Sequence, residues 1–163
     1  MATFGGPLDE LVDFNTIECL NQDEAYPVAN AFTDGDEFLA SHSTPELLVK
    51  VGFIHPVKLC GIKIQGTEEE AAPQRVKVFL ERPQLELDQV ETEEPAQELV
   101  LDPEHALGGT PVLLRTVKFQ HVQSIQLFVG QSGGSEQTRV ERIRFYGQPA
   151  LKAELKEFKP PVC

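Results

Sequence analysis

The chain has 163 residues, of which 40 % are hydrophobic and 25 % are charged, a composition that suits one soluble domain with a buried core. Its formal net charge of −12 disfavours nonspecific attraction to nucleic acid or anionic lipid, because both attract cationic surfaces. It contains no apolar run of about 18 residues and no signal-peptide pattern at its start. We therefore expect no nucleic-acid or membrane partner. We also expect a monomer and a cytoplasmic location that extends to the nucleus.

The N-terminal part of the chain is polar and punctuated by glycine and proline. Residues 1–12 are predicted to be a loosely ordered N-terminal segment with at most one short helical turn. Residues 13–21 form a short apolar segment. Three of its side chains are available for packing: Phe14, Ile17 and Leu20.

The central stretch, residues 46–66, contains two strand-like runs joined at His55-Pro56. Apolar side chains alternate in both runs, so one face of each predicted strand points inward. Pro56 has no N–H to donate and disfavours helix at the preceding residue, so we expect the chain to bend there. The predicted inward residues are Leu47, Val49, Val51 and Phe53 in the first run and Cys60, Ile62 and Ile64 in the second.

The second half of the chain predicts further strands separated by polar loops. Residues 83–104 carry acidic side chains without a single Lys or Arg, which is typical of a solvated loop. A glycine-rich hairpin loop is expected over 130–138, and a short amphipathic helix near the C-terminus. Alternating or β-branched runs predict strands at 75–81, 99–101, 112–119, 122–129 and 139–146, and the helix at 151–158.

These elements predict an all-β protein with short helical segments at its ends. Several short strands with turn signals between them are typical of a β-sandwich, here a jelly roll. The sequence contains no internal repeat, so residues 1–163 are expected to form a single domain.

One segment resembles a catalytic motif. Gly130-Gln131-Ser132-Gly133-Gly134 fits the pattern of a nucleophile elbow, which requires a following helix and a later triad histidine. A strand is predicted after it, and all histidines precede it: His42, His55, His105 and His121. A hairpin loop is therefore the better interpretation, and we expect no catalytic residues.

Metal and redox chemistry find no support in the spacing of candidate ligands. The histidines are not within ligand spacing of one another or of a cysteine, so neither a metal nor a cofactor is expected. Cys19, Cys60 and Cys163 form no C-x-x-C pair, and their odd number argues against a disulfide framework. Cys60 is expected to be a buried and inert thiol, whereas Cys163 at the chain end should react at once.

Several separate segments, in the same order along the chain, carry a resemblance to a known family. The chain resembles a PITH domain, the C-terminal module of thioredoxin-like proteins, from about residue 13 to residue 158. The matching segments are Glu18-Cys19-Leu20-Asn21, Glu46-Leu47-Leu48, Pro56-Val57-Lys58-Leu59, Ile62-Lys63-Ile64-Gln65-Gly66, Val76-Lys77-Val78-Phe79, Val117-Lys118-Phe119-Gln120 and Phe145-Tyr146-Gly147-Gln148-Pro149.

The resemblance implies a jelly roll similar to galactose-binding-like domains and a non-catalytic role in binding the 26S proteasome. Family members often carry a thioredoxin domain with a C-x-x-C pair before this module, and the present chain has neither. It is therefore similar to a stand-alone member or to an excised domain, and thioredoxin activity does not follow. The alternative is a carbohydrate-binding jelly roll, because related sandwiches often bind sugars. Fold alone does not decide between the two.

A candidate partner-binding surface lies on the last predicted strand. Opposite Ile143 and Phe145, the alternation places a cationic row with an aromatic ring, and Arg and Tyr are residue types that anchor protein interfaces. Structural roles are the alternative, because the arginines can pair with glutamates across the sheet or tie down the hairpin loop. The face is predicted to carry Val140, and the candidate contact residues are Arg139, Arg142, Arg144 and Tyr146.

Overall fold

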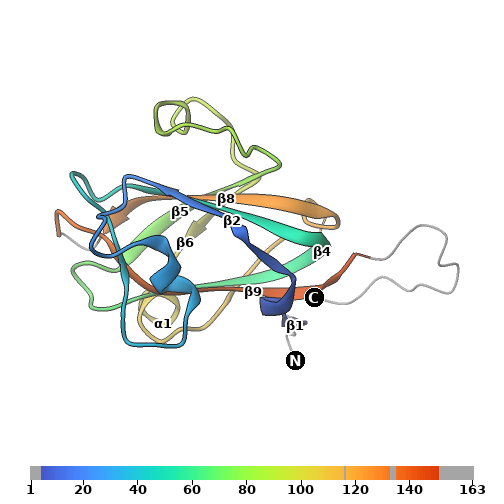
Figure 1. Ribbon diagram of the computed structural model, residues 1–163, viewed down its shortest axis with the longest axis horizontal. Helices are drawn as coiled ribbons and strands as arrows, with labels where there is room; N and C mark the ends of the chain where they lie inside the picture. The colour runs from blue at the N-terminus through green and yellow to red at the C-terminus, as the bar shows by residue number, and fades with distance from the viewer. Residues whose placement is uncertain (1–4, 116, 133–134, 151–163) are drawn as a thin grey trace, which may run out of the picture.

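A computed structural model of the chain describes residues 5–115, 117–132 and 135–150, without the side chains of residues 131 and 132. The strands form two layers, with β2 and β8 in the upper layer of Figure 1 and β9 in the lower one. All strand pairs within these described residues are antiparallel. The prediction of an all-β sandwich with a jelly-roll fold is confirmed.

Strand β4, Leu47–Gly66, belongs to both layers. Its first half, Leu47 to Gly52, pairs with β8, and its second half, Val57 to Gly66, pairs with β9. The register shifts between Gly52 and Val57, around the predicted bend at His55-Pro56. The two predicted runs are thus one continuous strand, and the bend moves the chain from one layer to the other.

The remaining strands attach to these two halves of β4. One layer contains β2 (Val12–Leu20), β8 (Val122–Ser132), β5 (Pro73–Leu80) and β6 (Gln97–Val100). The other layer contains β9 (Arg139–Pro149), with the short strands β1 (Gly6–Pro7), β3 (Leu39–Ala40) and β7 (Val112–Leu113) at its edges.

Over the part of the chain that the structure describes, helical structure is limited to short turns. They are η1 (Asp9–Leu11), η2 (Val28–Phe32), η3 (Leu87–Gln89) and α1 (Pro103–Ala106). None of the helices in the described ranges is long and apolar enough to span a bilayer.

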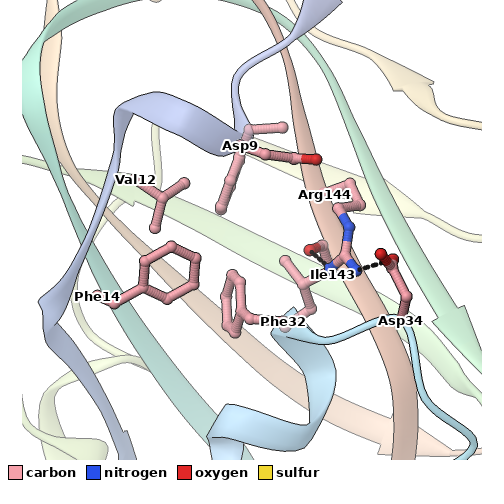
Figure 2. Close-up of a pocket in the computed structure, with 8 residues that line it drawn as sticks. Asp9, Val12, Phe14, Phe32, Asp34, Ile143 and Arg144 are labelled. Carbon is pink, nitrogen blue, oxygen red and sulfur yellow. Dashed lines mark hydrogen bonds and ion pairs between the residues drawn. The ribbon is translucent and has the colours of Figure 1, made fainter.

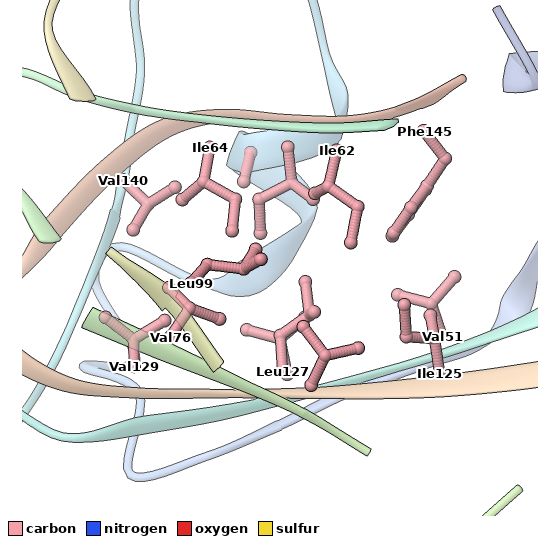
Figure 3. Close-up of a cluster of buried hydrophobic side chains, with 14 of the residues drawn as sticks. Val51, Ile62, Ile64, Val76, Leu99, Ile125, Leu127, Val129, Val140 and Phe145 are labelled. Carbon is pink, nitrogen blue, oxygen red and sulfur yellow. The ribbon is translucent and has the colours of Figure 1, made fainter. Parts of the chain in front are cut away.

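The main core fills the space between the layers. Ile62, Ile64 and Phe145 project from one layer toward Val51 and Leu127 on the other (Figure 3). Each of these side chains is at most 1 % exposed, so the alternation in both runs of β4 predicted the inward residues correctly, except at Cys60.

Cys60 departs from the prediction in two ways. A register shift lies between Leu59 and Gly61, so Leu59 joins Ile62 in the core while Cys60 belongs to neither apolar cluster. Cys60 is fully buried, as expected, but it is disulfide-bonded. The prediction of an inert free thiol is therefore wrong, because spacing along the chain does not report which cysteines meet in space. Cys163 lies outside the described residues.

The acidic segment after β5 is anchored by its apolar residues. Leu85 and Val90 pack with Leu48 and Phe128 on the outer side of the β4–β8 layer. Beside this second cluster, the Lys50 ammonium donates a 2.8 Å hydrogen bond to the Pro83 carbonyl. The segment is therefore not a fully solvated loop, because its acidic side chains alternate with side chains that the sheet buries.

Two predicted strands have different bounds in the structure, and one predicted helix lies outside the described residues. The strand expected at 112–119 is reduced to β7, because a turn then places the buried ring of Phe119 in the core and its carbonyl accepts a hydrogen bond from the Leu59 N–H. The strand expected at 99–101 is present as β6, which begins earlier. The helix expected at 151–158 lies outside the described residues.

The pairing of β9 with β4 gives a test of the fold. A Cβ atom on Gly147 would overlap the Lys58 carbonyl oxygen, which belongs to the backbone and cannot swing away. We expect Gly147→Ala to lower the free energy of unfolding by about 3 kcal/mol or more in urea titrations. Gly6→Ala is the matched control, because Gly6 pairs with Gly147 and yet has open space around it. Equal stability of the two variants would contradict this pairing.

Candidate interaction site

The guanidinium groups of Arg142 and Arg144 face the segment that follows η2. Arg144 donates to the carbonyls of Ala31 (2.9 Å) and Thr33 (2.8 Å) and to the Asp34 carboxylate (3.1 Å). Its side chain is only 12 % exposed. These two arginines therefore hold a neighbouring loop against β9, which is a structural use of the predicted cationic row.

Arg142 makes the same kind of contact with the later residues of this loop. Its terminal nitrogens donate to the carbonyls of Thr33, Asp34 and Gly35 at 3.0–3.3 Å. Backbone carbonyls are neutral acceptors, so these bonds of Arg142 neutralise none of the carboxylates of this loop. Arg142 thus holds an acidic loop at the surface. Its own terminal N–H groups are engaged in intramolecular hydrogen bonds.

Arg139 is also engaged within the chain. It donates to Gln137 (2.9 Å) and to the Glu68 carboxylate (3.2 Å), and its guanidinium lies 5.0 Å from the ring centre of Phe38. Phe38 in turn stacks on Tyr26, with 4.7 Å between ring centres. Arg139 therefore joins the loop before β9 to two other loops, as the structural alternative proposed.

The outer face of β9 is not the one that simple alternation predicts. A register shift between Arg142 and Val140 turns Val140 into the core, where it is fully buried beside Ile143. Val140 was therefore placed on the wrong face, because a bulge reverses the alternation. Tyr146 is half-buried, and burial, followed by the nearby Asp9 carboxylate, raises its pKa.

The structure reveals a pocket where β2 and β9 part. It has a volume of about 210 Å³ and is bordered by η1 and η2. Figure 2 shows the rings of Phe14 and Phe32 on one side and the Arg144–Asp34 pair on the other. The lining residues are Asp9, Val12, Phe14, Phe32, Asp34, Ile143, Arg144 and Phe145.

Phe14 is the residue of this pocket that sequence reasoning missed. It was expected to pack inside, yet its side chain is 59 % exposed. The β2–β4 register shifts between Asp13 and Glu18, so the chain beyond Asp13 departs from regular alternation. The ring packs edge-on against Phe32, with centres 6.4 Å apart. Because the irregular pairing depends on the tertiary fold, no local sequence signal would have identified Phe14.

The segment around Ser132 that fits the nucleophile-elbow pattern does not have the geometry of a nucleophile elbow. Ser132 is the last residue of β8, and the next element is strand β9, whereas a nucleophile elbow requires a helix there. Among the residues that the structure describes, no three His, Cys, Asp or Glu side chains gather in an arrangement that could hold a metal ion.

Two antiparallel layers of this topology define the chain as a galactose-binding-like β-sandwich. Its fold is similar to the family 32 carbohydrate-binding module of NanJ from Clostridium perfringens, which was solved in complex with galactose. The TM-score is 0.64 at 9 % identity, and the match covers 86 % of this chain and 98 % of that chain. CBM32-3 from a family 31 glycoside hydrolase of the same organism gives a TM-score of 0.61, 13 % identity, and coverage of 86 % and 97 %. At such identities the likeness shows the fold alone.

Sequence similarity identifies the family more specifically than the fold does. The model of the PITH domain family matches residues 4–161, and the chain belongs to this family. Thioredoxin-like protein 1 of Schizosaccharomyces pombe is 30 % identical over 140 residues, covering 82 % of this chain and 48 % of that protein. PITH domain-containing protein 1 of Danio rerio is 30 % identical over 144 residues, covering 84 % and 67 %.

The human PITH domain-containing protein 1 is also similar, at 25 % identity over 158 residues that cover 93 % of this chain and 72 % of that protein. The chain thus spans about half to three quarters of the length of these relatives. Membership of the family supports a non-enzymatic domain.

The contacts of Arg144 predict a structural penalty when they are removed. Arg144→Met keeps the length of the side chain but removes the charged donor of the Ala31 carbonyl. It also leaves the Thr33 carbonyl with the Arg142 donor in place of two charged donors. We expect a loss of about 2 kcal/mol or more in the free energy of unfolding. The same change at the exposed Arg115 should cost within about 0.5 kcal/mol. Equal urea midpoints for the two variants would refute the loop-holding role.

The environment of Cys19 predicts low thiol reactivity. Burial raises the pKa of its thiol to about 12, with the Glu18 carboxylate adding to the effect and a hydrogen bond with the Leu48 backbone opposing it. At about pH 8 the thiolate fraction should be roughly a thousandfold below that of an unfolded cysteine. We expect native alkylation of Cys19, identified by its loss in Cys19→Ser, to be correspondingly slow and to accelerate as the pH rises. Similar native and denatured rates would show that Cys19 is not shielded.

Proposed function

We propose that the chain is a non-catalytic protein-interaction module that binds the 26S proteasome. Membership of the PITH domain family supports this proposal, since the resemblance implies binding to that assembly. A net charge of −12 suits a protein partner with basic patches, because opposite potentials steer association.

The observation that carries the proposal is an exposed aromatic ring beside a pocket. Phe14 is 59 % exposed although it lies in a strand, and it borders a cavity of about 210 Å³. Aromatic anchors that meet shallow pockets are typical of protein interfaces, where they carry much of the binding energy.

The same region includes part of the predicted contact row. Arg144 lines the pocket, and Tyr146 follows it on β9 two residues later. We propose that a partner meets this face of the molecule, with Arg139, Arg142, Arg144 and Tyr146 at or near the contact. In this arrangement Arg142 and Arg144 position the acidic loop after η2, while the aromatic side chains supply contact area.

Capture of purified 26S proteasome by the immobilised full chain tests the function. We expect saturable capture by the wild-type chain, and capture weakened about tenfold or more by Tyr146→Ala. Val100→Ala is the control, because Val100 is 62 % exposed on β6 and lies outside the row. Failure of the wild-type chain to bind proteasome would refute the proposal, and unchanged capture by a folded Tyr146→Ala would remove Tyr146 from the contact.

Carbohydrate binding is the second candidate. The pocket combines the Phe14 ring with the carboxylates of Asp9 and Asp34, and the fold neighbour from NanJ was solved with galactose. Its volume of about 210 Å³ is below the roughly 300–1,000 Å³ that is usual for small-molecule sites, which favours the protein partner. Binding on a glycan array that Phe14→Ala abolishes would reverse this preference.

A further inference from the structure

The pocket between β2 and β9 has a chemistry that selects its occupant. Two carboxylates, Asp9 and Asp34, border it together with a single guanidinium, that of Arg144. The pocket therefore carries a net negative charge. Within the described ranges Asp9 forms no ion pair, and the Asp34 side chain is 98 % exposed despite its contact with Arg144.

Arg144 offers few terminal N–H donors to an incoming group. Its terminal nitrogens already donate to the carbonyls of Ala31, Thr33 and Ile143 and to Asp34. These bonds fix one wall of the pocket, and they leave an anionic ligand without the pair of donors that bidentate recognition of a carboxylate or phosphate requires. An anionic occupant is therefore disfavoured.

The aromatic wall favours a cation as well. The rings of Phe14 and Phe32 meet at an interplanar angle of 89°, so the exposed face of Phe14 is not covered by a stacked ring. The face of an aromatic ring attracts a cation through its quadrupole, and a guanidinium can in addition stack on it. A cation placed there would lie in the same pocket as the two carboxylates (Figure 2).

The size of the cavity completes the argument. A volume of about 210 Å³ admits one long side chain and excludes a folded element. We propose that this pocket receives a cationic side chain of the protein partner, arginine in preference to lysine, between the Phe14 ring and the carboxylates of Asp9 and Asp34. The inference rests on the proposed role as a protein-interaction module, and it defines the chemistry of the partner segment.

Peptide titrations followed by amide NMR of the full chain test the pocket directly. The probe is acetyl-Gly-Arg-Gly-amide, and the control is the same peptide with citrulline, which keeps the shape of arginine but lacks its charge. We expect the arginine peptide to shift the amide signals of Phe14, Phe32 and Asp34 saturably, the lysine peptide to bind more weakly, and the citrulline peptide to have little effect. Added salt should weaken the binding, because the attraction is partly between exposed charges.

Matched variants separate the two attractions. Phe14→Leu keeps an apolar side chain but removes the aromatic face, and should weaken binding of the arginine peptide about 3- to 30-fold. Asp9→Asn should weaken it about 2- to 5-fold without touching the Arg144–Asp34 pair. Asp88→Asn makes the same change of net charge in η3, on the loop at the top of Figure 1 and away from η1 and η2, and should have no effect.

Three results would overturn the inference. They are equal binding of the citrulline peptide, shifts that map to the segment around η3 instead of the pocket, and a response of the pocket to galactose but not to the arginine peptide. Proteasome capture by the same variants separates this inference from the proposed function. Normal capture by Phe14→Leu and Asp9→Asn removes the pocket from the interface while the function stands, whereas arginine-peptide binding without any proteasome capture refutes the proteasome as partner and leaves the pocket intact.

Discussion

The sandwich depends on a single strand that belongs to both of its layers. Because β4 pairs with β8 along its first half and with β9 along its second, the layers share one continuous backbone. Their relative position is therefore set by the bend near Pro56, a residue that has no N–H for the strand ladder. The core residues of both layers then meet because the alternation on each side of the bend points into the same space.

The pocket is a consequence of this arrangement. β2 pairs with the first half of β4 and β9 with the second half, so these two strands separate where the layers diverge. The turn η2 borders the opening, and Arg144 fixes the chain after η2 through backbone carbonyls. The basic residue Arg144 thus holds an acidic loop in place. The surface around the pocket is therefore acidic, although the arginines of β9 alone would suggest a basic one.

Domains that share this β-sandwich fold do not share one function. The neighbours that share the topology include domains solved with bound sugars, whereas the sequence places this chain among PITH domains. A β-sandwich supplies only a rigid support, and its loops and edges decide what it binds. For this chain, the exposed ring of Phe14 and the charges of Asp9 and Asp34 are the features of the pocket that can discriminate between partners.

The sequence by itself determined the fold class, the bend at Pro56 and, except at Cys60, the inward faces of β4, because period-2 alternation and the missing proline N–H act locally. The family was also readable from short segments in the correct order. Tertiary structure alone decided the exposure of Phe14, the burial of Val140 and the partners of Arg142 and Arg144. Register shifts reverse or interrupt alternation, and they arise from pairing with distant strands. The hydrogen bonds of a long arginine side chain likewise depend on which loop the fold brings within its reach.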